Sequence, residues 1–431
     1  MRPTIFEIND VGIRVARGTD EIVCSPGYAS YVEGRIELGE RGHAHAWLTP
    51  RHSSNRFWLE LNTSPLHQFG KRVRHAGDLA YLHLELLRER AGNPKSAIFI
   101  TPSTYQRAQL SLLLGVAQAN GMVVTALVDS AAAVGASLSP GQYLYLEATL
   151  HQAVLTRIDV DAEATRSHCE VLAGCGMVQF EQAMLGCIVD AFLSRCRFDP
   201  LHDASTEQLL HTHLPEWLRL LQQRPEIAIA IDFRGTRHET RIHRDALTAA
   251  TAPLVQQIER RVGGARLILD HRYLCIPGFF AQWPSARHLS PETVLHACAE
   301  DPELQAPPGN SGVSLRTSLA CIGPELPVRV PLAAPSAPIN APSHLLINHV
   351  AYPLTAIPIY LAARGEVRDR AEADSVCRLV LDPSGALIEP CNGAQVAING
   401  QTLVGSRALL IGDHLTIPGA TSLFVPIRVQ R

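Results

Sequence analysis

The chain has no long apolar run and no concentration of charge of one sign. No uninterrupted apolar stretch reaches the roughly 18 residues of a membrane span, and the first residues lack the apolar core of a signal peptide. Lys and Arg number 38 and Asp and Glu 41, for a formal net charge of −3, so no basic surface for nucleic acid is indicated. We therefore expect a cytoplasmic protein that neither inserts into membranes nor binds nucleic acid.

Paired metal-ligand motifs are missing as well. The ten cysteines form no C-x-x-C pair. Most lie in apolar or helix-like segments, as reduced packing residues do. The short His and Cys groupings lack the spacing of a zinc site, so we expect no metal centre.

A regular alternation of helical and strand patterns is present instead. Residues 77–92 and 104–121 have helical spacing, while 96–102 and 122–129 are short apolar runs typical of buried strands. Residues 55–62, NRFWLELN, predict a strand that would extend a β-rich opening. The later part of the chain, up to about residue 300, repeats this plan. The alternation favours an α/β architecture with strands in shared sheets.

Two stretches carry a resemblance to a known family. They are SAIFITPSTYQRAQLSLLLGVAQANGMVVTALVDSAAAVGAS (96–137) and QQRPEIAIAIDFRGTRHETRIHRDALTAATAPLVQQIERRV (222–262). Both resemble the actin-like ATPase superfamily, most closely the nucleotide-binding domain of the seventy-kilodalton heat-shock chaperones. The resemblance spans roughly residues 3–300. It implies a two-lobed α/β domain of the actin-like, ribonuclease-H-like type that binds ATP and Mg²⁺.

Asp129 stands where an apolar strand gives way to an alanine-rich helix. The resemblance implies that a carboxylate here orients the attacking water and holds Mg²⁺ through its hydration shell, which makes Asp129 the candidate catalytic residue of an active enzyme. The residues alone favour a helix N-cap, in which Asp129 or Ser130 accepts a hydrogen bond from an early helical N–H. Both interpretations stay open at this point.

The glycine-rich turns that the family uses to hold phosphate are altered. In FEINDVGIRV, Glu7 takes the family's Asp position, Asn9 its Gly and Asp10 its Thr. In YLEATLHQAVL, Glu147 lies near the Asp position and no glycine remains. Backbone N–H groups approach phosphate closely only where side chains are absent, and carboxylates facing phosphate repel it unless a metal intervenes.

The family's adenosine motif is altered too. In LDHRYLCIPGF, Asp270 and His271 replace two glycines. Three altered motifs at separate places indicate a decayed nucleotide site and no cofactor. If ATP and Mg²⁺ do bind, the resemblance points to Asp10, Glu147, Asp129 and Asp270 as their ligands.

A second use of the acidic residues is a cation site. Glu7, Asp10, Asp129 and Glu147 together offer the oxygen ligands that Mg²⁺ and Ca²⁺ prefer. Against this, converging carboxylates raise one another's pKa and destabilise the site, so some of them are expected to point into water.

The composition changes after residue 300. Residues 301–345 are dense in proline and predict an extended linker. Residues 346–431 consist of short strand patterns separated by turns and predict a small β-sandwich. Within it, CRLVLDPSGALIEPCNGAQVAINGQTLVGSRALLIGDHLTI (377–417) resembles the carboxyl-terminal half of a forkhead-associated domain.

Forkhead-associated domains bind phosphothreonine, and this resemblance implies a site here at Arg364, Ser375 and Arg378. These side chains suit a phosphate through charge-assisted hydrogen bonds. The alternative is that they are solvated loop residues, because the family's histidine is missing.

Two functions follow from these observations. The first is a non-catalytic or weakly catalytic actin-like pseudo-ATPase, 1–300, joined through 301–345 to a forkhead-associated-like domain, 346–431, and acting as a scaffold for protein partners. The second is an atypical ATPase of the heat-shock type that uses ATP and Mg²⁺, with the carboxyl-terminal domain regulating it.

Overall fold

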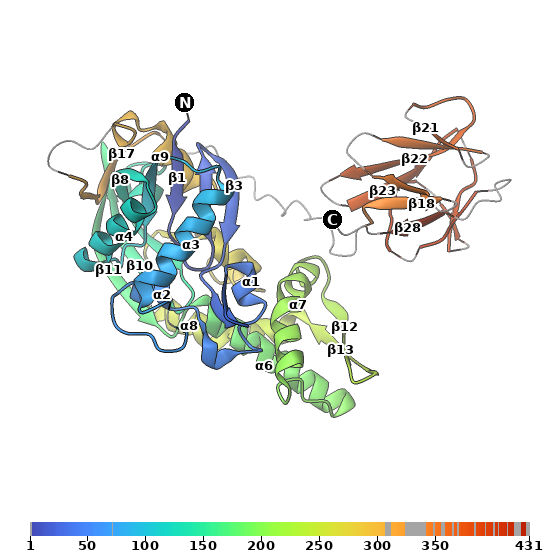
Figure 1. Cartoon of the computed structure of the whole chain (residues 1–431), viewed down its shortest axis with the longest axis horizontal. Coiled ribbons are helices and arrows are strands. Elements are labelled where there is room, and N and C mark those ends of the chain that lie inside the picture. Colours follow the sequence, from blue (N-terminus) through green and yellow to red (C-terminus); the bar gives the residue numbers. More distant parts are fainter. Residues whose placement is uncertain are drawn as a thin grey trace. The chain divides into compact units, whose positions relative to one another are not determined.

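In the computed structural model the described residues are 2–70, 72–306, 312–323, 342–347, 350–354, 358–363, 366–368, 370–382, 385–392, 394–399, 401–403, 405–411, 413–417 and 424–427. The chain divides into two compact units, Met1–Val328 and Arg329–Arg431 (Figure 1). None of the helices within the described ranges has the length and apolar character that a bilayer crossing requires.

The first sheet is built from β1 (Thr4–Glu7), β2 (Ile13–Arg17), β3 (Asp20–Ser25), β7 (Ser96–Thr101), β8 (Val123–Asp129) and β16 (Leu315–Arg316). Its order is β16-β8-β7-β1-β2-β3. β1, β2 and β3 are antiparallel neighbours, whereas β7 joins β1 in parallel and β8 joins β7 in parallel. β7 and β8 lie inside the sheet and are largely buried, which explains their apolar sequences.

The second sheet repeats this arrangement with β9 (Gly141–Ala148), β10 (Gln152–Val160), β11 (Glu163–Ala173), β14 (Leu267–Leu269), β15 (Arg287–His288) and β17 (Ser318–Ala320). Its order is β15-β14-β9-β10-β11-β17. β9, β10 and β11 are antiparallel, and β14 and β15 add in parallel on the side of β9. The predicted mixed α/β region is therefore confirmed.

The main helices are α3 (Ala76–Arg90), α4 (Arg107–Ala119), α5 (Ser130–Gly135), α6 (Met177–Cys196), α8 (Arg244–Val262) and α9 (Thr293–Glu300). α3 and α4 share an apolar core with one face of the first sheet. α5 and α9 share a core with the other face of that sheet and with the second sheet. α6 and α8 cover the remaining face of the second sheet. The two sheets thus sandwich a thin helical layer.

The alanine-rich sequence of α5 suits this inner layer. Ala131, Ala132 and Ala133 are fully buried. At Gly135 a Cβ atom would lie 2.7 Å from the Cβ of Ala164, closer than real side chains approach. Small side chains are needed here because the helix lies directly against a strand of the second sheet.

Further elements lie beside the second sheet and near the amino terminus. α7 (Ala204–Gln223) and the hairpin β12 (Glu226–Phe233) and β13 (Thr236–His243) pack against one another and α6, as the green part of Figure 1 shows. The smaller elements are β4 (Ala29–Val32), β5 (Arg35–Leu38), β6 (Ser53–Ser54), α1 (Glu40–His43), α2 (Phe57–Glu60), η1 (Pro50–His52), η2 (His271–Cys275), η3 (Phe280–Gln282) and η4 (Pro302–Leu304).

The strand predicted for residues 55–62 is wrong, because Phe57–Glu60 form the short helix α2. Phe57 and Trp58 are both buried, although neighbouring residues of a strand point to opposite faces. The indole N–H of Trp58 donates to His83 Nδ1 of α3 at 3.0 Å. Packing against α3 therefore decides the local structure.

The proline-rich segment contributes to the first unit. β16 pairs with β8 and β17 pairs with β11. Part of the segment expected to be a linker thus adds a strand to each sheet, and the compact unit continues to Val328.

The second unit contains two antiparallel sheets around one core. Their orders are β19-β18-β28-β27-β24-β25 and β21-β20-β22-β23-β26. Leu345, Ile398 and Phe424 from one sheet share this core with Leu379 and Ile388 from the other. The strands are β18 (His344–Ile347), β19 (Val350–Pro353), β20 (Ile359–Ala362), β21 (Val367–Arg368), β22 (Ser375–Asp382), β23 (Gly385–Pro390), β24 (Ala397–Ile398), β25 (Gln401–Thr402), β26 (Arg407–Ala408), β27 (Leu415–Thr416) and β28 (Phe424–Ile427).

Candidate functional site

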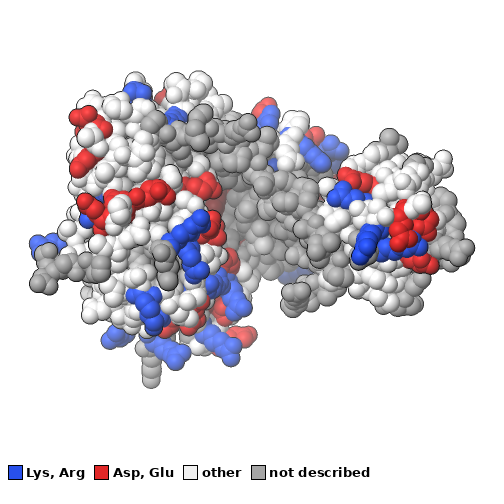
Figure 2. Space-filling model, turned by 90° about the horizontal axis from the view of Figure 1, so that it is seen from above, with Lys and Arg blue, Asp and Glu red and all other residues white. Residues whose placement is uncertain are grey.

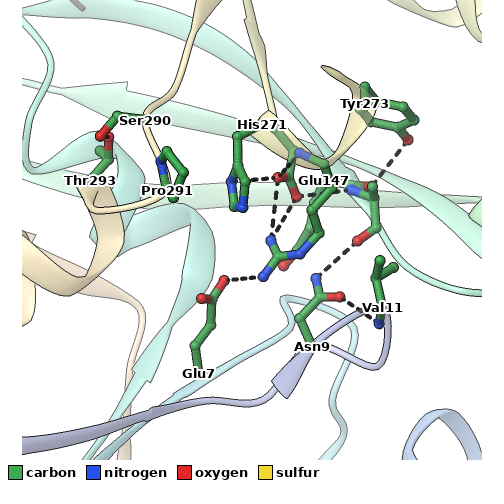
Figure 3. Close-up of polar contacts among 12 residues, drawn as sticks. Glu7, Asn9, Val11, Glu147, His271, Tyr273, Ser290, Pro291 and Thr293 are labelled. Atoms are coloured by element: carbon green, nitrogen blue, oxygen red, sulfur yellow. Dashed lines mark hydrogen bonds and ion pairs between the residues drawn. The ribbon is translucent and has the colours of Figure 1, made fainter. Parts of the chain in front are cut away.

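The structure brings the three altered turns together between the two sheets. The Asn9 amide after β1 donates to the carbonyl of Ala148 at 2.9 Å (Figure 3). Asp10 accepts a hydrogen bond from the backbone N–H of Leu150 at 2.8 Å. The N–H of Ala148 in turn donates to Asp270 at 3.2 Å. Turns far apart in the sequence therefore form one contact region.

An arginine that no motif singled out occupies this region. Arg272, in η2, donates from Nη2 to Glu7 Oε1 at 2.7 Å and from Nη1 to Asp270 Oδ2 at 3.1 Å. Its side chain is 7 % exposed. Because Glu7 belongs to the first sheet and Arg272 follows the second, this ion pair ties the two halves of the unit together.

Glu7 has a second cationic partner on the neighbouring strand. Arg14 lies directly opposite Glu7 in the β1–β2 ladder and forms a buried ion pair with it. Its Nη1 also donates to the carbonyl of Pro291. Burial raises the pKa of Glu7, but the guanidiniums of Arg272 and Arg14 outweigh that effect and hold the pKa below its ordinary value.

Asp270 is held in the same manner. Burial raises its pKa, whereas Arg272 and His271 lower it, and the net result is a pKa well below the usual range. Asp270 also accepts a hydrogen bond from the N–H of Arg272 at 3.0 Å, which caps η2. The Asp270 carboxylate is thus fully buried, and donors surround both of its oxygens.

Asp129 caps α5, so the N-cap interpretation is confirmed. Its Oδ1 accepts hydrogen bonds from the N–H groups of Ala131 at 3.0 Å and Ala132 at 3.4 Å, and from the Ser103 hydroxyl at 2.8 Å. Arg166 Nη1 lies 3.2 Å from Oδ2. Asp129 is fully buried, and this burial raises its pKa.

Arginines pair with Glu7, Asp129 and Asp270, whereas Asp10 and Glu147 have no such ion pair among the described residues. Burial raises the pKa of Asp10 to about 6. Burial, followed by the negative charge of Asp270, raises the pKa of Glu147 well above its ordinary value. Glu147 accepts a hydrogen bond from the Ser130 hydroxyl at 3.1 Å. Asp10 and Glu147 thus have raised pKa values and no ion pair with an arginine, whereas the pKa of Asp129 is raised although Arg166 lies beside it.

The acidic side chains do not form a cation site. Within the described ranges, no three His, Cys, Asp or Glu side chains are grouped so that they could hold a metal ion. The expectation that Glu7, Asp10, Asp129 and Glu147 converge on Mg²⁺ or Ca²⁺ is wrong, because arginines and hydrogen-bond donors take up the carboxylates. The expectation that some point into water is wrong too, since all four are buried.

A small cavity lies beside the first two turns. It has a volume of about 10 Å³ and lies among Ile8, Asp10, Trp58, Tyr105 and Thr149. One water molecule needs roughly 10–15 Å³ by a comparable measure. The cavity has no room for a triphosphate group.

A second group of contacts joins the halves away from the turns. Trp47 stacks on His211 of α7, with ring centroids 3.4 Å apart. The Gln208 amide donates to the carbonyl of His43 and accepts from the N–H of Trp47, both at 3.1 Å. Burial, and then the charge of His43, lowers the pKa of His211 to about 3, so this ring is neutral at physiological pH.

The predicted phosphothreonine residues are not brought together among the described residues. Ser375 is buried, and its Oγ accepts a hydrogen bond from the N–H of Glu372. Arg378 pairs with Glu389 at 2.8 Å. Three positions apart on β22, these residues point to opposite faces of the strand. Arg364 lies outside the described residues.

No protein-family model matches the chain, and no curated protein matches it in sequence. The functional argument therefore depends on the geometry of the site.

Proposed function

We propose that residues 1–300 form an actin-like, two-lobed domain of the heat-shock-seventy type that has lost nucleotide binding and serves as a scaffold for protein partners in the cytoplasm. Two sheets of matching strand order, separated by a thin helical layer, fit the plan of that superfamily. The proposed lobes are the halves built on these two sheets. The proposed role is assembly rather than catalysis.

The observation that carries this proposal is the position of Arg272. A nucleotide bound between such lobes would need its phosphates close to the backbone of the turns. Arg272 and its carboxylate partners lie there instead and join both halves. Removing one partner of a buried ion pair costs about 3–5 kcal/mol, so an incoming nucleotide would have to offset a cost of that order.

The turns also lack the bare backbone that phosphate binding requires. Asn9 stands where the family has glycine, and its side chain hydrogen-bonds to the opposite turn. Asp10 satisfies the N–H of Leu150. Asp10 thus occupies a backbone N–H that could otherwise donate to an anion. Both side chains also join the first turn directly to the second.

The surface charge fits protein partners better than nucleic acid. On the face shown in Figure 2, acidic and basic side chains form small groups, and neither sign covers the whole face. Nucleic-acid-binding surfaces concentrate Lys and Arg on one face or along a groove. Mixed small groups are typical of ordinary protein surfaces.

Calorimetric titration of the full chain with ATP and Mg²⁺ tests the proposal. We expect no binding in the micromolar range, because the cavity at the turns is too small and Arg272 is engaged. Micromolar affinity for ATP would refute the pseudo-enzyme proposal. Hydrolysis that is lost in Asp129→Ala but retained in a surface control, Arg195→Gln, would establish the alternative, an atypical ATP- and Mg²⁺-dependent ATPase.

For the second unit we propose a forkhead-associated-like interaction domain. Its antiparallel sheets around one core agree with this. The burial of Ser375 and the pairing of Arg378 with Glu389 argue against phosphothreonine recognition through these residues. A phosphothreonine peptide library tests this directly: binding by the full chain that is lost in Arg378→Gln would contradict the interpretation of the site.

A further inference from the structure

A separate pocket lies on the second sheet, away from the interlobe turns. It has a volume of about 580 Å³. Its floor consists of β9, β10 and β11, and its wall consists of the last turn of α8 and the loop that leads to β14. The volume falls within the range of roughly 300–1,000 Å³ that small-molecule sites occupy.

Three arginines line this pocket from two directions. Arg157 projects from the floor, where it lies between Leu144 on β9 and His168 on β11 in the strand register. Arg261 and Arg266 come from the wall. Residues distant in sequence thus place three guanidiniums around one hollow.

The positive charge of the pocket is only partly compensated. Glu170 is the single carboxylate in its lining, and its Oε1 lies 3.6 Å from Arg261. The nearby Asp159 accepts a hydrogen bond from Gln142 at 2.9 Å. Within the described part of the chain, Arg157 and Arg266 have no carboxylate partner.

Arg266 is held in place although it is exposed. Its guanidinium carbon lies 4.6 Å from the centroid of the Tyr143 ring, a cation–π contact. One of its nitrogens also lies close to the backbone of Gly141, where a Cβ would be only 2.7 Å away. An ordered guanidinium loses less rotamer entropy when it binds a ligand than a freely moving one does.

We propose that this pocket binds a small phosphate monoester. The planar guanidinium presents parallel N–H donors that match the oxygens of phosphate. Arg157 and Arg266 supply this group from the floor and the wall, and His168 adds a further polar contact. Leu144 and Leu155 provide apolar area for the carbon part of the ligand.

The proposal does not depend on the state of the interlobe cleft, and its test uses probes without adenine. Isothermal titration of the full chain with glycerol 3-phosphate is expected to show saturable binding that weakens as NaCl is raised. Arg157→Gln and Arg266→Gln are each expected to weaken binding roughly tenfold, since each removes a charge-assisted contact. Arg195→Gln, an exposed arginine of α6 outside the pocket, is the matched control and is expected to bind as the native chain does.

Titrations with inorganic phosphate and with glycerol test the phosphate group and the carbon part of glycerol 3-phosphate separately. Binding of inorganic phosphate with similar affinity supports the site and assigns recognition to the phosphate group alone. Equal binding of glycerol, unchanged affinity in both arginine variants, or absence of binding at millimolar glycerol 3-phosphate each overturns the proposal. Binding of a phosphorylated peptide in place of glycerol 3-phosphate overturns it as well and identifies a protein ligand.

Discussion

Replacing Arg272 by methionine tests whether the interlobe ion pairs hold the first unit together. The substitution keeps most of the side-chain length but leaves Glu7 and Asp270 without the cation between them. Arg14 still faces Glu7, whereas Asp270 keeps His271, the Tyr145 hydroxyl and backbone donors but no guanidinium. Breaking a buried pair by removing one partner costs about 3–5 kcal/mol, and we expect Arg272→Met to lose stability in that range.

Urea unfolding followed by tryptophan fluorescence measures this loss. All four tryptophans of the chain, at positions 47, 58, 217 and 283, lie in the first unit, so their emission reports that unit. Arg237→Met is the matched control, because the Arg237 side chain is 65 % exposed and lies 3.7 Å from Asp232. Its effect is expected to stay within about 0.5 kcal/mol. A loss below about 1 kcal/mol in Arg272→Met would refute the argument.

A double variant separates lost charge compensation from lost packing. Arg272→Met combined with Asp270→Asn removes the cation together with a carboxylate that has no other guanidinium partner, while the buried Glu7–Arg14 pair stays in place. Replacing a buried ion pair by uncharged side chains is often close to neutral, so the double variant is expected to regain most of the stability that the single variant loses. If it were instead as unstable as the single variant, the charges would not be the cause.

Three further predictions concern buried groups. Because burial raises the pKa of Asp10 to about 6, the folded chain binds a proton that the unfolded chain releases between about pH 4 and pH 6, and Asp10 destabilises the fold above that window. Asp10→Asn is therefore expected to raise the urea midpoint more at pH 7.5 than at pH 5, and an equal change at both would contradict this. Asp129→Ala removes the cap of α5 and is expected to cost about 1–2 kcal/mol, whereas Asp129→Asn keeps the acceptor oxygen and should cost less; equal losses would show that the cap is not the cause. Gly135→Ala places a Cβ 2.7 Å from that of Ala164 and is expected to cost about 1–3 kcal/mol in thermal or urea unfolding, while Gly186→Ala, on α6 with open space around it, should be neutral or stabilising.

Much of the α/β framework could be predicted because local patterns and packing agree. Residues 77–92 overlap α3 in all but its first residue, and residues 104–121 contain α4. The apolar positions of both helices face the first sheet. The pattern of residues 55–62 led to the wrong prediction of a strand, because aromatic residues are common both in strands and in short buried helices. What decided between them was the bond from Trp58 to His83, a contact 25 positions away that no local pattern contains.

The acidic residues of the turns could be identified in the sequence, but the arginines that form ion pairs with them could not. Arg14 lies across from Glu7 on the next strand, but the hairpin that pairs them was not predicted from the sequence. Arg272 lies 265 positions from Glu7, and only the closure of one half on the other brings them together. Without these arginines, the acidic residues suggested a metal site or mutual repulsion. Charge compensation over such distances requires the fold.

The loss of glycine and the gain of arginine in the turns are parts of one change under the proposed function. Without Arg272, Asp270 would be a buried carboxylate with no guanidinium partner, and Arg272 by itself would leave a buried cation. Either state costs several kcal/mol, because an unpaired charge in the interior loses its hydration without recovering it. Arg272, Glu7 and Asp270 together form a network in which the charges compensate one another. In an active nucleotide site, a metal ion would supply positive charge to the phosphates; here the Arg272 guanidinium supplies positive charge to the carboxylates. The acidity of these turns is therefore accounted for by an internal ion pair, and under the proposed function a nucleotide could enter only by separating it.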